Sequence, residues 1–202
     1  MAFFSFLLLV QPSQAETSED FNELDLFLYG DLDNGNGNIS TLAPVSDVDT
    51  QSDCPQEANR LSWPGQDRQW TSVGSWIVDL ETPGSIASGE HMFTIWANST
   101  QGTVEDVQFR ISVTLGGGTA DGQATSQSKT ITDSSEEATK FEISFDLTNE
   151  SFNQNPSDND QLEVEIEYSG GDPGQNPVTG GQSTEQIVIL TSSIDHPAGI
   201  SE

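Results

Sequence analysis

The chain has 202 residues, of which 33 are Asp or Glu and only 5 are Lys or Arg, giving a formal net charge of −28. This charge excludes nucleic-acid binding as a default function, because contacts with phosphates need Lys and Arg to displace counterions. Repulsion between the negative charges of different molecules keeps such a protein in solution. The protein suits surroundings in which salt or calcium screens the repulsion between its own charges. A saline habitat explains the acidity more simply than a specific acidic function does.

Residues 1–15 have the pattern of a secretory signal peptide. Residues 2–10 form a mainly apolar run that is too short to cross a bilayer as a helix. Ser13 and Ala15 place small side chains at the positions that signal peptidase reads, which predicts cleavage after Ala15. No Lys or Arg precedes the apolar run, which a natural start upstream of Met1 would explain. An exposed hydrophobic N-terminal strand is the alternative.

We expect a polar leader at residues 16–22 and a single domain at residues 23–202, with no membrane span in the later chain. Cys54 is the only cysteine, so no disulfide can form within the chain. Its neighbours include no His, Lys or Arg that would lower its pKa, and a catalytic role is therefore not expected. In an exported protein this thiol would either pair between chains or stay free.

Residues 24–29 predict a first strand with apolar side chains on both faces. The strand ends at residues 30–37, which are rich in Gly, Asp and Asn, the types that favour tight turns. Residues 39–42 predict a short strand. The stretch 43–60 is polar, acidic and interrupted by Pro, and we expect a long surface loop there.

Residues 70–80 and 90–97 predict the next two strands, and Trp76 and Trp96 inside them are expected to be core or half-buried. The clearest strand pattern lies at residues 104–118, where apolar and polar side chains alternate strictly from Val107 to Leu115. Its apolar face consists of Val107, Phe109, Ile111, Val113 and Leu115.

The remaining strands are expected at residues 123–132, 141–147, 162–168 and 187–190. The first of these is polar and suits a sheet edge, whereas the last is apolar on both faces. Only residues 133–139 suggest a helix, and they are too few to form one. About eight strands without helices predict an all-β fold, a two-sheet antiparallel β-sandwich of the jelly-roll type.

The succession of strand patterns from LDLFLYG through VQFRISVTLGGGT to VILTSSIDHPAG resembles the galactose-binding-like jelly-roll domains. Such domains occur in secreted prokaryotic and archaeal surface proteins. The resemblance covers most of the chain after the signal peptide and rests on strand patterns rather than on chemical motifs. It implies a two-sheet sandwich, often with a structural calcium and sometimes with a sugar site in the loops, and it transfers no ligand-binding residue.

The turn after the first strand is the best candidate for a calcium site, because it is rich in the oxygen ligands that Ca²⁺ prefers. The calcium pattern D-x-[DN]-x-[DN]-G is not met, since Gly35 occupies the third ligand position, and a solvated turn is the alternative. A second acidic loop, residues 155–160, is a weaker candidate. The predicted ligands are Asp31, Asp33, Asn34 and Asn36.

The loop LSWPGQDRQW is the predicted sugar site. Trp63 and Trp70 at its two ends offer flat apolar surfaces for sugar rings, and Asp67 and Arg68 between them offer hydrogen-bonding groups.

The sequence contains none of the common catalytic motifs. No nucleophile elbow, zinc-binding helix or phosphate-cradling loop occurs, and His91 and His196 are expected to be structural or exposed rather than catalytic.

Three N-x-[ST] sequons predict glycosylation if the host supplies the machinery, although chance alone could supply some of them. Their acceptors are Asn38, Asn98 and Asn149.

Together these patterns predict a secreted, non-catalytic accessory module at the cell surface, with an extracellular glycan as its ligand and Ca²⁺ as a structural ion. The alternative is a structural subunit or repeat of a cell-envelope assembly, in which sheet edges or the Cys54 region contact a neighbouring surface protein. The sequence does not name the ligand.

Overall fold

The computed structural model describes residues 26–30, 37–54, 70–86, 88–100, 103–116, 120–132, 137–148, 150–152, 160–170 and 187–201. All the secondary-structure elements assigned within these ranges are strands. The described residues therefore contain no helix that could cross a membrane. The strands are β1 (Leu26–Tyr29), β2 (Gly37–Ser40), β3 (Thr50–Asp53), β4 (Thr71–Asp79), β5 (Gly84–Ile86), β6 (Gly89–Ser99), β7 (Val104–Leu115), β8 (Gly122–Thr125), β9 (Lys129–Ile131), β10 (Thr139–Leu147), β11 (Glu150–Phe152), β12 (Gln161–Ser169), β13 (Ile187–Thr191) and β14 (Gly199–Ser201).

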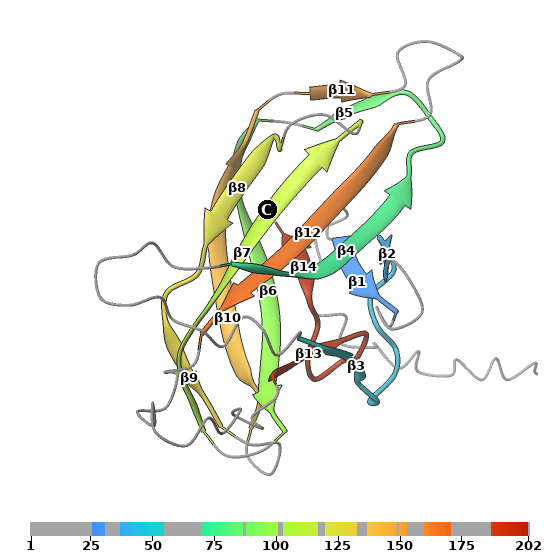
Figure 1. Cartoon of the computed structure of the whole chain (residues 1–202). Coiled ribbons are helices and arrows are strands. Elements are labelled where there is room, and N and C mark those ends of the chain that lie inside the picture. Colours follow the sequence, from blue (N-terminus) through green and yellow to red (C-terminus); the bar gives the residue numbers. More distant parts are fainter. Residues whose placement is uncertain are drawn as a thin grey trace, which may run out of the picture.

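One sheet of 12 strands contains most of these elements, in the order β3-β13-β6-β14-β1-β2-β4-β12-β7-β8, with β10 beside β6 and β9 beside β7. The strands β5 and β11 form a separate pair. The sheet is mixed, because β2 runs parallel to β4. Figure 1 shows that it turns over on itself, so that β4, β12, β7 and β8 form a front layer and β6 and β10 lie behind them.

The core lies between these two layers. Phe109 on β7 meets Phe141 on β10 edge-on, with ring centroids 4.9 Å apart and an interplanar angle of 82°. Both rings are fully buried, and they come from opposite layers. An edge-on aromatic pair contributes about 0.5–1.5 kcal/mol beyond the burial of its area. This contact therefore joins the layers near the middle of the core.

The all-β prediction is confirmed, but the prediction of two separate antiparallel sheets of about eight strands is not met. The layers are hydrogen-bonded into one sheet through β14, β1 and β2, and one strand pair is parallel. The number of strands exceeds the predicted eight because several strands are too short to be recognised in the sequence. The strands β5, β9, β11 and β14 have three residues each, which is too few to display a period-two pattern.

Part of the predicted surface loop at residues 43–60 forms the strand β3 instead. Its sequence, TQSD, contains no apolar residue, so no alternation marks it. It nevertheless pairs with β13, and Ser52 within it is buried. The predicted edge strand at residues 123–132 is divided into β8 and β9, both of which pair with β7.

The strand β7 follows its predicted pattern closely. Val107, Phe109, Ile111 and Val113 are buried, whereas Leu115 is only partly buried. On the opposite face, Arg110 donates to Glu167 of the neighbouring β12 at 2.6 Å.

The strands β6 and β13 create a second, smaller apolar surface behind the core. Along β6, Phe93, Ile95 and Ala97 are buried in the main core, and Trp96 lies on the opposite face. Along β13, Ile187 and Ile189 belong to the main core, while Val188 and Leu190 pack with Ala138 beside Trp96. The apolar character predicted for both faces of residues 187–190 is therefore explained, because each face has its own cluster.

A substitution at Gly37 would test how tightly β2 packs on β4. A Cβ atom at Gly37 would overlap the indole ring of Trp76, which is fully buried. We expect Gly37→Ala to lower the free energy of unfolding by about 1–3 kcal/mol, the usual cost of overpacking a core, as measured by urea denaturation. Asn38→Ala, at the neighbouring exposed position, should change it by less than about 0.5 kcal/mol. Equal stabilities of the two variants would contradict this packing.

Candidate functional site

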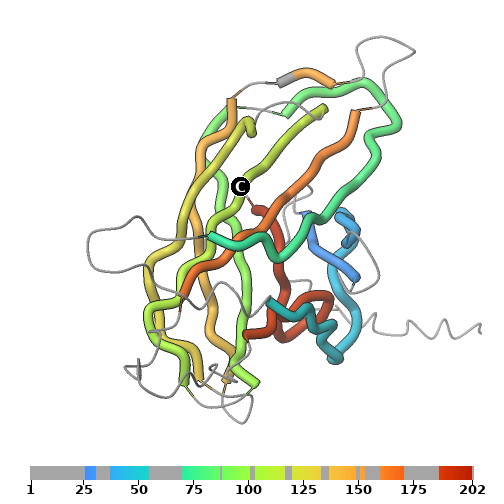
Figure 2. The backbone as a smooth tube through the Cα atoms, in the orientation of Figure 1, coloured from blue at the N-terminus to red at the C-terminus, as the bar shows by residue number. Residues whose placement is uncertain are grey.

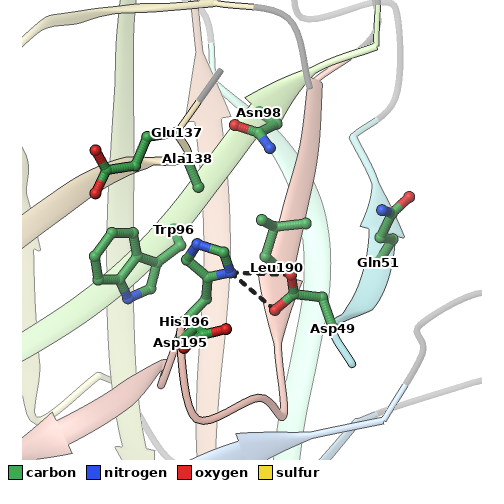
Figure 3. Close-up of a pocket in the computed structure, with 9 residues that line it drawn as sticks. All are labelled: Asp49, Gln51, Trp96, Asn98, Glu137, Ala138, Leu190, Asp195 and His196. Carbon is green, nitrogen blue, oxygen red and sulfur yellow. Dashed lines mark hydrogen bonds and ion pairs between the residues drawn. The ribbon is translucent and has the colours of Figure 1, made fainter. Parts of the chain in front are cut away.

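An open groove of about 560 Å³ lies on the outer face of the rear layer, at β6, β13 and β3. The sheet register builds its floor, because Trp96, Leu190 and Gln51 are direct neighbours across these three strands. Figure 3 shows the side chains that line it. They are Asp49, Gln51, Trp96, Asn98, Glu137, Ala138, Leu190, Asp195 and His196.

The lower wall joins two segments that are far apart in the sequence. The peptide N–H of Ile194 donates to the carbonyl of Ser46 at 2.8 Å, and Ser46 forms a β-bridge with Ser193. Figure 2 shows these segments, before β3 and after β13, side by side. Their contact places Asp49 opposite His196.

Asp49 orients the imidazole ring of His196. The Nδ1 atom of His196 lies 3.0 Å from Oδ1 and 2.9 Å from Oδ2 of Asp49. The hydroxyl of Ser193 donates to the same carboxylate and accepts the peptide N–H of His196. The carboxylate thus requires a donating Nδ1–H, and the second ring nitrogen points into the groove towards Ala138 (Figure 3).

This arrangement differs from a Ser-His-Asp catalytic triad. In a triad, the serine hydroxyl lies at the ring nitrogen that faces away from the carboxylate. Here Ser193 is fully buried, and its hydroxyl is bonded to Asp49 instead. Among the described residues that line the groove there is no Ser, Thr or Cys that could take the place of the nucleophile. Within this part of the chain, the pair therefore positions a hydrogen-bonding ring without an adjacent nucleophile.

Trp96 is held in one orientation at the side of the groove. Its Nε1–H donates to the carbonyl of Pro197 at 3.1 Å, and its ring meets that of His196 edge-on at 5.0 Å. The ammonium group of Lys140 lies 5.8 Å from the ring centroid. An ordered indole at an open groove is a suitable surface for stacking a ligand.

Asn98 contributes the most unusual polar group of the site. The residue is only 8% exposed, and its Oδ1 is buried without a hydrogen-bond partner among the described residues. A buried acceptor without a partner costs about 1–3 kcal/mol. Because this oxygen is buried, a ligand could donate to it and recover part of that free energy only if the Asn98 side chain turned towards the groove.

The residues of the predicted sugar site are not brought to this groove. Trp70 is half-buried, and the guanidinium of Arg110 covers its ring at 4.7 Å from the centroid. Arg110 belongs to β7 of the front layer and is bonded to Glu167, so this indole is engaged in structural contacts. Trp63, Asp67 and Arg68 lie outside the described residues.

The predicted calcium ligands Asp31, Asp33, Asn34 and Asn36 also lie outside the described residues. Within the described ranges, no group of three or more His, Cys, Asp or Glu side chains could hold a metal ion.

The three predicted glycosylation acceptors differ in their placement. Asn38 is exposed on β2, and Asn149 lies outside the described residues. Asn98 lines the groove within β6, and its burial does not favour a glycan on the folded chain.

The sequence also draws attention to Trp96, Asn98 and His196, but for other roles. One local pattern could have linked two of them: Trp96 and Asn98 are two residues apart on a strand, on the face opposite the core residues.

Comparisons with known proteins relate the chain to others by fold alone. No protein-family model and no curated protein matches the chain. An α-amino acid ester hydrolase of known structure matches 88% of this chain with a TM-score of 0.54 and 13% identity. Two structures of a CocE/NonD family hydrolase from Staphylococcus aureus match 87% of it, each with a TM-score of 0.51 and 12% identity. The chain spans only 35–36% of the length of these hydrolases.

Cys54 is neither exposed nor part of the groove. It is 1% exposed, and its peptide N–H donates to the carbonyl of Ile187 at 2.9 Å. Desolvation by burial, with a smaller effect of the Asp53 carboxylate, raises the pKa of the thiol. Burial of the thiol in the core therefore favours a free thiol over pairing between chains, the two outcomes that the sequence left open.

The raised pKa of Cys54 predicts a loss of stability in alkali. Above its ordinary pKa of 9.0 the thiol ionises more readily in the unfolded chain, so the free energy of unfolding falls as pH rises. This one group contributes at most about 1.4 kcal/mol per pH unit. Urea denaturation between about pH 7 and 10.5 should show a shallower decline for Cys54→Ala than for the unchanged chain. Equal slopes, together with rapid labelling of the native thiol, would contradict this burial.

Proposed function

We propose that the chain is a secreted, non-catalytic module of the galactose-binding-like jelly-roll type that binds an extracellular glycan in the groove beside Trp96. The observation that carries the proposal is the combination of an ordered indole with a positioned imidazole in one open groove. Export is supported by the signal-peptide pattern of residues 1–15.

Sugars present two kinds of surface, and the groove has a counterpart for each. The C–H face of a pyranose is apolar and stacks on flat aromatic rings, for which the Trp96 indole is available. Sugar hydroxyls donate and accept hydrogen bonds, for which Gln51, Asn98 and His196 provide partners. The volume of about 560 Å³ lies in the range of small-molecule sites, and the open shape suits one or two units of a longer chain.

The proposed absence of catalysis rests on the surroundings of His196. Acyl transfer needs a nucleophile at the free ring nitrogen. The hydroxyl of Ser193 is instead committed to Asp49, and the Asp49 carboxylate is bound to the imidazole. These groups support binding and orientation better than they support a reaction.

An alternative function is structural, as a subunit of a cell-envelope assembly. The observation in its favour is a group of exposed apolar side chains on the segment before β3 and on the bend after β13. Contiguous exposed apolar surface is typical of protein contacts. A contact there would lie outside the groove lining, so binding and assembly can be tested separately. The residues are Leu42, Val45, Val48 and Ile194.

A structural calcium at residues 31–36 belongs to the proposal as well. The flanking residues Gly30 and Gly37 lie close together, since a Cβ atom built on Gly30 would be 3.7 Å from the Cα atom of Gly37. If Ca²⁺ binds only the folded chain, its removal lowers stability by mass action. We expect EDTA to lower the melting temperature by about 5 °C or more, and added Ca²⁺ to restore it. An unchanged midpoint would remove calcium from the proposal.

Substitution of Trp96 tests the glycan site directly. An array of neutral, amino and acidic oligosaccharides would identify a ligand, and isothermal titration would measure its Kd. We expect Trp96→Ala to weaken binding at least about tenfold, because the stacking surface is lost. Trp96→Phe should retain part of the affinity.

Trp70→Ala is the matched control, because Trp70 is also half-buried but lies against Arg110 of the front layer. It should leave the Kd unchanged. Binding that is lost in Trp70→Ala and retained in Trp96→Ala would place the site in the sequence-predicted loop. No binding to any sugar on the array would contradict the proposed function.

A further inference from the structure

We infer that the groove beside Trp96 selects glycans that carry free amino groups over acidic glycans. This inference rests on the proposed glycan-binding function and specifies its ligand class. It follows from the chemistry of the groove lining, whose described residues include three carboxylates and no Lys or Arg.

The charged side chains of the lining are mainly acidic. Asp49, Glu137 and Asp195 carry carboxylates, and among the described lining residues there is no Lys or Arg. The Asp49 carboxylate already holds His196 and Ser193, which leaves Glu137 and Asp195 as the exposed carboxylates at the rim. An ammonium group on a ligand would therefore meet negative charge at the edge of the groove.

The nearest Lys side chain does not reverse this balance. Lys140 lies 5.8 Å from the Trp96 ring, but its ammonium group is paired with Glu142 at 2.7 Å. A hydrogen bond from Lys140 lowers the pKa of the Glu142 carboxyl, so this carboxylate stays charged beside the ammonium. The same ring that attracts Lys140 would attract a ligand ammonium by cation–π interaction.

The interior of the groove also favours ligands that donate hydrogen bonds. The Asn98 Oδ1 has no hydrogen-bond partner among the described residues, and a turn of this side chain would present it to a ligand. The indole N–H of Trp96 is already used by Pro197. A hydroxyl or ammonium group can donate to the Asn98 acceptor, whereas the carboxylate of a uronic acid or the sulfate of a sulfated sugar cannot. The net charge of −28 adds long-range repulsion of such anions.

The test compares four oligosaccharides of equal length by isothermal titration at about pH 6, where carboxyl groups are ionised. They are a glucosamine oligomer, its N-acetylated counterpart, a neutral glucose oligomer and an oligouronate. We expect the glucosamine oligomer to bind about tenfold more tightly than the neutral oligomer at low salt, and the oligouronate not to bind measurably. The difference should shrink in 0.5 M salt, at which about 4 Å of screening length remains.

Charge-removing variants identify the groups responsible. Glu137→Gln and Asp195→Asn together should bring the Kd of the glucosamine oligomer to within about twofold of that of the neutral oligomer, whose own Kd stays unchanged. Glu163→Gln is the matched control, because it removes one carboxylate from β12 of the front layer, outside the groove. It should leave the tenfold preference in place.

The possible failures are distinguishable. Equal binding of amino and neutral oligomers overturns the amino-sugar selectivity and leaves glycan binding intact. A preference that falls equally in Glu163→Gln and in the rim variants also overturns it, because general attraction to an acidic protein would then explain the preference. Tighter binding of the oligouronate contradicts the charge argument. Binding of none of the four would remove the proposed function together with this inference.

Discussion

The alternation of side chains along β6 connects the core of this molecule to its groove. Phe93, Ile95 and Ala97 point inward and are buried, whereas Trp96 and Asn98 point outward and line the groove. The strand is held on both edges, by β10 on one side and by β13 and β14 on the other. A slip of one residue would exchange the two sets of side chains, which would expose the core and bury the site. The register that forms the core therefore also positions Trp96.

The rest of the site depends on contacts between distant parts of the chain. Asp49 and His196 are separated by 147 positions, yet their side chains are bonded to each other at the end of the groove. Two features make this possible: the pairing of β3 with β13, and the bridge between Ser46 and Ser193. The buried hydroxyl of Ser193 then holds both the Asp49 carboxylate and the His196 backbone. An imidazole held in this way is suited to orienting a ligand.

The sequence predicted what local patterns can encode. Alternation located β6, β7, β10 and β12, because each runs through the core for nine or more residues. It could not reveal β3, whose four residues are polar, or the pairing of the chain end with residues before β3. Charged neighbours in the sequence favour Trp70 for the site, but Arg110, distant in sequence, covers its ring. The strand pattern correctly predicts a core or half-buried Trp96, but it does not show that a groove lies on the outer face of that strand.

The central claim is that a glycan contacts Trp96, and the indole N–H signals of the four tryptophans report on it directly. In a ¹⁵N–¹H spectrum, the Trp96 signal can be assigned by its loss in Trp96→Phe. During titration with an oligosaccharide that binds, we expect this signal to shift in a saturable way, because the indole N–H is fixed to Pro197 at the side of the groove. The Trp70 signal, on the front layer beside Arg110, should stay in place. A saturable shift of the Trp70 or Trp63 signal with the Trp96 signal unmoved would contradict the account.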